Sequence, residues 1–335
     1  MNDSDPPSFS EFQLIELIRR AAGDPGAGVT IGIGDDAAAL CLSGELLITV
    51  DVMNQDVHLP LELMSHEQMG ARAVLAAASD ICAMGARPQW IFVGLAVPLD
   101  LDAGAALALG QGIVRGCEIV GAHLVGGDLT RGALSISVTV LGRSPEGGAI
   151  RRSGAKPGDL IYVGGTLGDA CLGLSLMRGE IQSDDPQEAA RLKARFCEPH
   201  PQLELGALLG EWQLAHALID VSDGLIQDLG HVAQASDVAM EIDVQFVPRS
   251  PLFEQAFVDQ PQRLARILGW GEDFRLAFCI SPDAAQRLES ATAQFDERPV
   301  CVGRVLQAGP EGPRVTLLDA QGQPLDLPDG GYRHF

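Results

Sequence analysis

The residues with the clearest chemical potential are aspartates that stand in apolar or glycine-rich surroundings. Most of them follow a predicted strand, as in GIGDD, LLITVD and LIDVSDG, and one lies in an alanine-rich helical pattern. The set comprises Asp35, Asp36, Asp51, Asp80, Asp128, Asp220 and Asp223. Two unit charges ~5 Å apart repel by roughly 3 kcal/mol at an effective dielectric constant of ~20, so a cluster of such groups requires cations.

The ligand atoms indicate which kind of cation would bind. Oxygen ligands without His or Cys partners suit hard ions, Mg²⁺ above all, and protein-bound Mg²⁺ usually takes its other ligands from substrate phosphates. Asp35 or Asp223 alone could equally be a helix cap or a turn residue. Taken together, the acids favour a site for Mg²⁺ and a phosphate-bearing substrate.

Two common phosphate-binding motifs do not explain this pattern. Gly32, Gly34 and Ala37 fit the G-x-G-x-x-A spacing of dinucleotide-binding folds, and Asp51 follows the next strand as the ribose acid would. However, residues 35–43 are too few for the required crossover helix, and two carboxylates would face the pyrophosphate. Neither of the two lysines stands in a G-K-[ST] sequence. A kinase without that lysine must neutralise the transferred phosphoryl group with metal ions and arginine.

Other polar residues have two interpretations each. Arg151 and Arg152 could contact phosphate or could be solvated linker charges. His58 lies in a polar loop between a strand and a helix, where it could contact substrate or be a plain surface residue. Glu272 and Asp273 precede a predicted strand, where acids are ordinarily turn residues.

Hydrophobic periodicity places these residues on alternating strands and helices. The sequence predicts helices over about 9–22, 65–84 and 103–120. It predicts two more, one that starts near 169 and one in the second part of 218–235. The strand-like runs are 29–33, 46–50, 90–97, 134–141, 160–163, the start of 218–235, 241–247 and 276–280. The polar stretch around Asp184, Asp185 and Pro186 predicts an exposed loop. This order of elements predicts an α/β (α+β) fold.

Chain length and a Gly- and Pro-rich segment predict two domains. The chain has 335 residues, about twice the usual ~150-residue domain. Residues 142–158, GRSPEGGAIRRSGAKPG, form the best candidate boundary. We therefore expect an N-terminal domain over 1–148 and a C-terminal α/β domain over 149–335.

Composition excludes several classes of function. The formal net charge is −22, which argues against nucleic acid and anionic lipid as partners. Charged residues interrupt the most apolar region, so we expect no membrane span. The N-terminus lacks the basic and apolar regions of a signal peptide, which predicts a cytoplasmic protein. The seven cysteines are never closer than 22 residues and suggest neither a zinc site nor a disulfide framework.

Eight segments, in order along nearly the whole chain, resemble the bacterial thiamine-monophosphate kinase family. They are GIGDDAAAL (32–40), SDICAMGA (79–86), LVGGDLTRG (124–132), RRSGAKPGD (151–159), TLGDACLGL (166–174), IDVSDGLIQDLGH (219–231), GEDFRL (271–276) and the closing GYRHF. The resemblance implies a mixed-sheet N-terminal domain that dimerises through its strands, a C-terminal α/β domain, and ATP bound with several Mg²⁺ ions. The same superfamily contains aminoimidazole-ribonucleotide synthetase, selenophosphate synthetase and a hydrogenase maturation protein.

The resemblance also implies roles for individual residues. The implied metal ligands are Asp36, Thr49, Asp51, Asp80, Asp128, Asp220 and Asp223. The implied ATP contacts are Gly127, Asp128, Arg152 and Ser222, and the implied substrate contacts are His58, Glu272 and Tyr332. Roles for Arg151, Asp35 and Asp273 stay open. The family often has Thr where Val50 and Leu129 stand, which removes a possible hydroxyl ligand at each position.

The implied activity is Mg²⁺-dependent transfer of a phosphoryl group from ATP to thiamine monophosphate, giving thiamine diphosphate and ADP. Catalysis would depend on Asp36, Asp128 and Asp223, which hold the metal ions, and on Arg152; the metal ions and Arg152 position and neutralise the phosphates. Two alternatives remain at this point. One is a sibling ATP-dependent cyclo-ligase acting on a purine precursor, and the other is a non-catalytic module that binds nucleotide or divalent cations.

Overall fold

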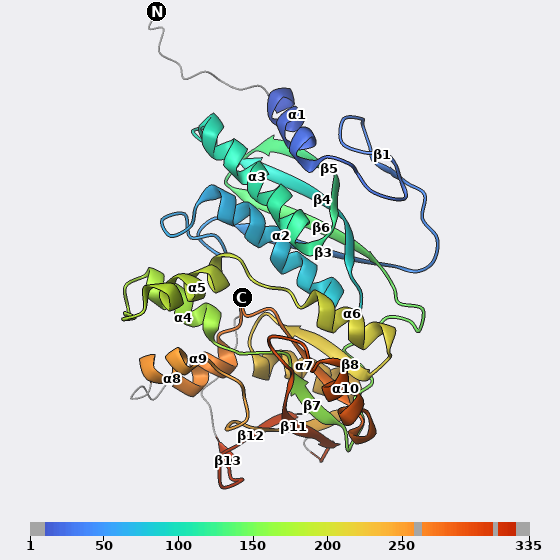
Figure 1. Cartoon of the computed structure of the whole chain (residues 1–335), viewed down its shortest axis with the longest axis vertical. Coiled ribbons are helices and arrows are strands. Elements are labelled where there is room, and N and C mark those ends of the chain that lie inside the picture. The colour runs from blue at the N-terminus through green and yellow to red at the C-terminus, as the bar shows by residue number, and fades with distance from the viewer. Residues whose placement is uncertain (1–10, 258–262, 311–313, 326–335) are drawn as a thin grey trace, which may run out of the picture. The chain divides into compact units, whose positions relative to one another are not determined.

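A computed structural model describes residues 11–257, 263–310 and 314–325 (Figure 1). The chain forms two compact units. The first unit comprises residues 1–81 and 87–144, and the second comprises 82–86 and 145–335. The chain thus passes into the second unit at 144–145, beside the boundary of 148–149 that the sequence suggests. Mixed α/β structure in two parts confirms the predicted fold class.

The first unit is built on a four-stranded mixed sheet in the order β3-β6-β4-β5. Its strands are β3 (Leu46–Asn54), β4 (Pro88–Val97), β5 (His123–Arg131) and β6 (Ser135–Arg143). Only the β4–β5 pair is parallel. A separate pair of short strands, β1 (Val29–Ile31) and β2 (Ala39–Leu40), precedes the sheet.

Helices α2 (His66–Cys82) and α3 (Ala103–Val120) lie over one face of this sheet (Figure 1). Small residues let their backbones approach closely. A Cβ added at Gly112 would lie 1.9 Å from the carbonyl oxygen of Glu67, and one at Gly116 would lie 2.8 Å from the side chain of Val74. The alanine-rich pattern of α2 therefore serves helix-helix packing. Helix α1 (Glu11–Ala22) packs on α3.

Helix α3 is long and apolar enough, by length and composition alone, to cross a bilayer. The expectation of no such span rested on charges in the surrounding sequence, yet only Arg115 and Glu118 fall inside the helix itself. Half of the helix is buried within the fold, and Asp102 caps its N-terminus by accepting from Ala105 N–H at 2.9 Å. Core helices of soluble proteins meet the same criterion, so this helix is weak support for a membrane role.

The second unit is built on a seven-stranded sheet in the order β13-β12-β9-β11-β7-β10-β8. Its strands are β7 (Leu160–Val163), β8 (Ala215–Val221), β9 (Val238–Asp243), β10 (Arg275–Ile280), β11 (Val300–Gln307), β12 (Arg314–Leu318) and β13 (Pro324–Leu325). Its helices are α4 (Asp169–Met177), α5 (Pro186–Cys197), α6 (Leu203–Glu211), α7 (Leu225–Ser236), α8 (Pro251–Ala256), α9 (Arg263–Gly269) and α10 (Ala285–Ala291), with a 3₁₀ turn at Pro282–Ala284. The β12–β9 pair is parallel, and the other pairs are antiparallel.

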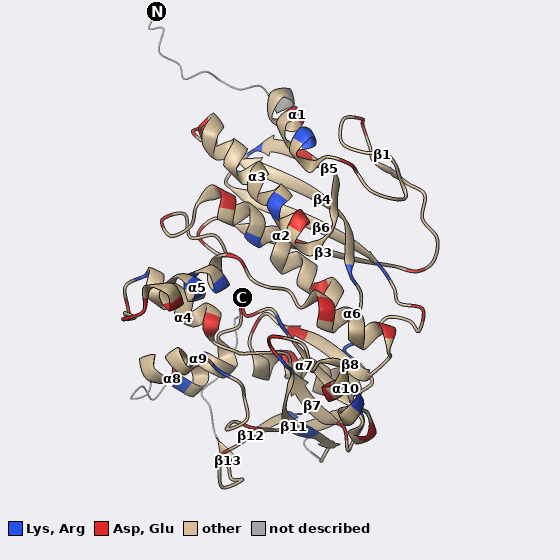
Figure 2. Ribbon diagram, viewed as in Figure 1, with Lys and Arg blue, Asp and Glu red and all other residues tan. Residues whose placement is uncertain are grey.

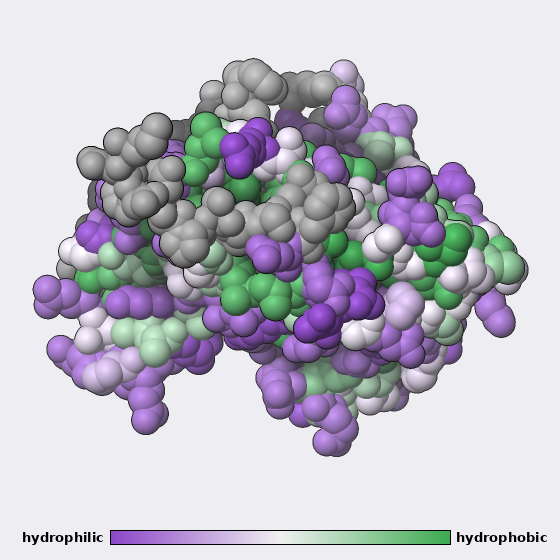
Figure 3. Space-filling view, turned by 90° about the horizontal axis from the view of Figure 1, so that it is seen from above, coloured by the Kyte–Doolittle hydropathy of each residue, from purple (hydrophilic) through white to green (hydrophobic). Residues whose placement is uncertain are grey.

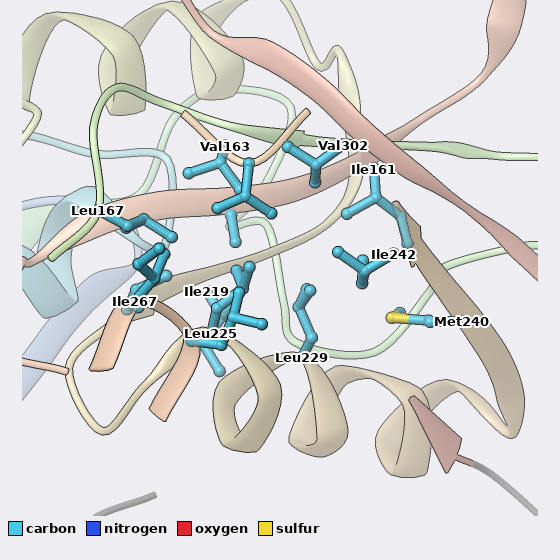
Figure 4. Close-up of a cluster of buried hydrophobic side chains, with 14 of the residues drawn as sticks. Ile161, Val163, Leu167, Ile219, Leu225, Leu229, Met240, Ile242, Ile267 and Val302 are labelled. Carbon is cyan, nitrogen blue, oxygen red and sulfur yellow. The ribbon is translucent and has the colours of Figure 1, made fainter. Parts of the chain in front are cut away.

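The largest core cluster of the second unit lies between this sheet and its helices. In Figure 4, Leu225 and Leu229 of α7 lie beside Ile219 of β8 and beneath Ile161 and Val163 of β7. All five side chains are at most 1% exposed. Burying each side chain contributes about 1.5–3 kcal/mol, so this packing fixes α7, and the turn before it, on the sheet.

Strand directions bring three loops to one end of the second sheet. Strand β10 is antiparallel to both β7 and β8, and Ala277 pairs with Val163 while Arg275 pairs with Val221. The C-terminal ends of β7 and β8 therefore meet the N-terminal end of β10. The loops at this end are 164–168, 222–224 and 270–274, and we call them the β7, β8 and β10 loops.

Candidate active site

Strand β3 and helix α2 join two predicted metal ligands in the first unit. The hydroxyl of Thr49 donates to Asp80 Oδ2 at 2.5 Å. Asp51 lies two residues further along β3, on the same face as Thr49, because strand side chains alternate. Oxygen atoms from Thr49, Asp51 and Asp80 therefore lie on the helix-covered side of β3.

Asp128 lies at the opposite edge of the same sheet. Cross-strand pairing runs from Asp51 through Val138 and Val93 to Gly127, the neighbour of Asp128. Three strand separations of about 4.8 Å put Asp51 roughly 14 Å from this position. A single ion cannot take direct ligands from both edges within one chain, since Mg²⁺–oxygen distances are about 2.1 Å.

The segment that carries Asp36 runs beside β5, the strand of Asp128. A Cβ at Gly126 would lie 3.7 Å from the Cβ of Ala38. Asp36 is exposed, and its backbone N–H donates to Asp35 Oδ1 at 2.9 Å. Asp35 therefore has the turn role that the sequence left open, whereas the side chain of Asp36 is available for a ligand.

His58 lies in a tight turn that follows β3. Its N–H donates to the carbonyl of Asn54 at 3.0 Å, and its ring Nδ1 accepts from the N–H of Asn54 at 3.3 Å. An acceptor Nδ1 means that the proton of the neutral ring is on Nε2. The half-buried imidazole is thus oriented by its own turn.

In the second unit, the β8 loop collects three predicted residues. Asp220 is the penultimate residue of β8 and is 3% exposed, and Ser222 and Asp223 follow in the turn before α7. Asp228, one turn into α7, accepts through Oδ2 from the N–H groups of Ser222, Asp223 and Gly224, each at 3.1 Å. This one carboxyl group fixes the whole loop.

The charges at this loop favour a cation. Burial, followed by the negative charges of Asp220 and Asp223, raises the pKa of Asp228 to about 8 although backbone N–H groups oppose the shift. Ionisation of Asp228 is thus disfavoured, because it would place a third negative charge beside those of Asp220 and Asp223. A hard cation suits such a pair of carboxylates.

The β10 loop holds Glu272 against the β8 loop. The N–H of Glu272 donates to the carbonyl of Ser222 at 2.8 Å, and the N–H of Phe274 donates to that of Val221 at 2.9 Å. A Cβ at Gly271 would lie 2.2 Å from the carbonyl oxygen of Ser222, so only glycine fits there. Glu272 is therefore fixed at the same end of the sheet as Ser222 and Asp223.

The segment with Arg151 and Arg152 runs beside the edge strand β8. The N–H of Leu218 donates to the carbonyl of Arg151 at 3.0 Å, and the hydroxyl of Ser236 accepts from the N–H groups of Gly154 and Ala155 at 3.1 and 3.2 Å. Both arginine side chains are exposed. The predicted phosphate contact, Arg152, thus has an exposed side chain on a segment whose backbone is anchored by hydrogen bonds.

The predicted residues form separate groups within each unit, one around β3 and α2, one along β5 and one around the β8 loop. Tyr332 lies outside the described residues. In the part of the chain that the structure describes, no three His, Cys, Asp or Glu side chains are grouped to hold a metal ion. Acidic residues are scattered over both units (Figure 2), and on the face shown in Figure 3 hydrophilic side chains surround small hydrophobic groups.

Comparison with known proteins identifies the family of this chain. Residues 34–144 match the N-terminal domain of AIR synthase related proteins, and residues 156–315 match the C-terminal domain of the same group. The thiamine-monophosphate kinase of Haemophilus influenzae is 34% identical over 98% of this chain and 98% of its own length. The chain belongs to the thiamine-monophosphate kinase family.

Solved structures agree with this assignment. The crystal structure of thiamine-monophosphate kinase from Stenotrophomonas maltophilia K279a superposes with a TM-score of 0.81 at 34% identity, covering 92% of this chain and 96% of that one. AaThiL complexed with AMPPCP and TMP gives a TM-score of 0.74 at 30% identity, covering 97% of each chain. The thiamine-monophosphate kinase fold therefore spans both units of this protein.

Sequence reasoning missed the residues that hold this kinase-family site in place. Asp228 and Ser236 were not singled out, and Asp273 was left without a role. Asp228, the last residue of IDVSDGLIQD, has the same apolar surroundings as Asp220 and Asp223. Those surroundings were the one sequence signal that could have pointed to it. Ser236 and Asp273 act on segments 81 to 105 residues away, and no local pattern reveals such contacts.

Proposed function

We propose that this protein transfers the γ-phosphoryl group of ATP to thiamine monophosphate, giving thiamine diphosphate and ADP. The observation that carries the proposal is the full-length similarity to AaThiL, a protein solved with AMPPCP and TMP. The oxygen-rich groups at β3–α2, at β5 and at the β8 loop supply suitable chemistry. A cytoplasmic location and the absence of nucleic-acid and membrane partners stay predictions.

The proposed ligands of Mg²⁺ are those that the sequence indicates. They are Asp36, Thr49, Asp51, Asp80, Asp128, Asp220 and Asp223. The donor atoms fit Mg²⁺ because they are oxygen atoms, and because the charges of Asp220 and Asp223 already disfavour a further ionised neighbour in Asp228. Mg²⁺ bound there would neutralise phosphate oxygens and withdraw negative charge from the transferred group.

The proposed reaction needs no strong general base. The attacking oxygen belongs to a phosphate monoester that is largely ionised near neutral pH. The protein then contributes position and charge. Gly127 would contact the ATP phosphates through its backbone, Ser222 would donate a hydrogen bond, and Arg152 would bring a positive charge. His58, Glu272 and Tyr332 would hold thiamine monophosphate, with Tyr332 as a stacking surface for its rings.

A homodimer would resolve the separation of the acids in the first unit. Asp36 and Asp128 lie along β5, whereas Asp51 and Asp80 lie at β3, on the opposite edge of the sheet. Ile48, Val50 and Val52 expose an apolar strip on the uncovered face of β3, with exposed fractions of 62%, 59% and 46%. Packing two such faces together buries the strips. Because Asp51 and Asp80 lie on the helix-covered side, the β5 acids of one chain would have to reach them past the free edge of β3.

The deciding experiment is a product assay. Purified protein is incubated with ATP, Mg²⁺ and thiamine monophosphate, and thiamine diphosphate is separated and detected as its fluorescent thiochrome derivative. We expect thiamine diphosphate and ADP in equal amounts. A purine-precursor ligase would give neither product with this acceptor, and a non-catalytic binding module would give no ADP that depends on the acceptor. Either of those results would refute the proposed function.

The metal requirement has its own test in thermal stability. Because bound Mg²⁺ relieves repulsion among the carboxylates and binds only the folded chain, we expect Tm to rise as millimolar Mg²⁺ is added to EDTA-treated protein. An equal ionic strength of K⁺ is the control. A Tm that is the same in Mg²⁺ and K⁺ would contradict the proposed metal ligands.

A further inference from the structure

Asp273 is a buried acid whose hydrogen-bond partners lie more than 100 residues away in the sequence. Its Oδ2 accepts from the N–H of Gly168 at 2.7 Å, and its Oδ1 accepts from the N–H of Ala170 at 3.1 Å. The side chain thus joins the β10 loop to the start of α4. Both oxygen atoms are used, and the residue is 9% exposed.

Helix α4 has no N-cap side chain of its own. The cap residue is Gly168, in a left-handed conformation with φ of 83°, and a Cβ there would lie 2.6 Å from the ring of Phe253. The first N–H groups of a helix need an acceptor, and a negative charge near them is favourable. Asp273 supplies the acceptor from another part of the chain.

The residues on either side of Asp273 have unfavourable backbone conformations. Glu272 and Phe274 have φ angles of +64° and +49°, which non-glycine residues rarely adopt. Such conformations cost about 1–3 kcal/mol each and persist only where the surroundings hold them. The backbone bonds to Val221 and Ser222 hold the loop on one side, and the Asp273 carboxylate holds it on the other.

We propose that Asp273 is a positioning residue, which anchors the β10 loop to the start of α4 and so sets where Glu272 meets the phosphoryl acceptor. This inference rests on the proposed function, because Glu272 matters only if it contacts thiamine monophosphate. Asp273 itself touches no substrate. Its effect is confined to the acceptor side, since Asp228 independently fixes Ser222 and Asp223 through their N–H groups.

The test compares Asp273→Asn with Thr166→Val in steady-state kinetics. The asparagine keeps one acceptor oxygen but turns an NH₂ group toward the second backbone N–H, so the anchor is half lost. Thr166 donates to Asp169 Oδ2 at 2.7 Å at the same helix start and is not a hydrogen-bond partner of Asp273. The valine variant therefore perturbs α4 to a similar degree while leaving the Asp273 bonds intact.

We expect Asp273→Asn to raise KM for thiamine monophosphate about tenfold, because displacements near 1 Å at a binding group have effects of up to about 100-fold. The KM for ATP and kcat should stay within about twofold of wild type. Thr166→Val should leave both KM values unchanged. An unchanged acceptor KM in Asp273→Asn, or equal effects of both variants on both KM values, would overturn the proposal and leave Asp273 as a helix cap only.

A measurement on the wild-type protein covers the case in which Asp273→Asn fails to fold. Adding thiamine monophosphate with Mg²⁺ should slow amide hydrogen exchange at Gly168 and Ala170. When Glu272 binds the acceptor, the β10 loop is restrained, and the Asp273 carboxylate stays hydrogen-bonded to these two N–H groups. Unchanged exchange there in acceptor-saturated protein would also overturn the proposal. Failure of the proposed function is separate, since it would appear as wild-type protein that makes no thiamine diphosphate.

Discussion

At the scale of single residues, the acids in apolar surroundings are the strongest functional signal, and replacing them tests charge rather than shape. We expect Asp36→Asn, Asp128→Asn and Asp223→Asn each to lower kcat by about 100-fold or more, because each removes a carboxylate that would hold Mg²⁺ beside the phosphates. Their Tm values should stay close to wild type.

The matched control for these variants is Asp102→Asn, since Asp102 caps α3 and asparagine is an equally good cap. It should keep normal kcat and Tm. Normal turnover in the three site variants, measured by thiamine diphosphate formation at saturating Mg²⁺, would remove these acids from the mechanism.

Asp273 also predicts a pH dependence of stability. Burial raises its pKa to about 7 in the folded protein, against 3.8 for an exposed Asp, although N–H groups of Gly168 and Ala170 oppose the shift. Between these two pH values the folded chain binds more protons than the unfolded chain, so the contribution of Asp273 is present at low pH and is lost as pH rises through about 7.

Relative to Asp273→Asn, the free energy of unfolding of wild type should therefore fall by up to about 1.4 kcal/mol per pH unit over this range. Urea titrations of both proteins at several pH values measure the difference. A difference that stays constant with pH would contradict the raised pKa, and Thr166→Val should show the wild-type slope.

Sequence reasoning indicates candidate ligands more readily than the residues that hold them. Asp80 was indicated by its apolar surroundings and Thr49 by the family resemblance, and the structure joins them by a hydrogen bond. The partners of Asp228 are backbone N–H groups, which every sequence possesses, so composition and spacing could not distinguish it from the other acids of its segment. The same reason explains why Asp273 looked like an ordinary turn residue.

At the scale of elements, the turn between β8 and α7 is the best-defined part of the site. Only Oδ2 of Asp228 accepts the three N–H bonds, and its pKa of about 8 means that the group is largely protonated at neutral pH in the metal-free protein. Asparagine mimics that protonated form, whereas alanine leaves the three N–H groups without this acceptor.

We therefore expect Asp228→Ala to raise the Mg²⁺ concentration needed for half-maximal rate several-fold, while Asp228→Asn stays near wild type. Asp237→Asn, at the other end of α7 with φ of 53°, is the control because asparagine tolerates this conformation. Mg²⁺ titrations of the initial rate make the comparison. Equal Mg²⁺ requirements in the alanine and asparagine variants would show that the turn does not depend on this acceptor.

Elements with strong periodicity were predicted well, and those with interrupted patterns were not. The structure confirms the helix at 103–120 and the strand at 160–163 with the expected bounds. Strand β5 was missed because Gly126 and Gly127 interrupt its alternation. Residues 184–186 are exposed as predicted, but Asp185 is the N-cap of α5 and Pro186 its first residue. An Asp-Pro pair before Leu192 and Phe196 is a helix-start signal that the loop prediction overlooked.

At the scale of the whole molecule, the two-unit α/β design followed from the order of elements and the Gly- and Pro-rich segment. The order of strands within each sheet did not follow. Strand β10 inserts between β7 and β8 although both precede it in the chain, and such pairing depends on packing across the complete sheet. The separation of Asp51 from Asp128 is a consequence of the strand order in the first sheet, and it motivates the proposal of a second copy of the chain.

The dimer is therefore both a structural and a catalytic prediction. Val50 is the middle residue of the exposed strip on β3, and lysine there would bring two like charges into a dry interface of the proposed dimer. We expect Val50→Lys to sediment as a monomer. Its kcat should fall in proportion to the fraction of monomer, since each site of a monomer would lack Asp128 of the partner subunit. Leu99→Lys, at a residue 79% exposed but outside the sheet, should stay dimeric and active. A Val50→Lys protein that remains dimeric, or a wild-type monomer with full activity, would contradict the shared site and would require Asp51 and Asp128 to act on separate ions within one chain.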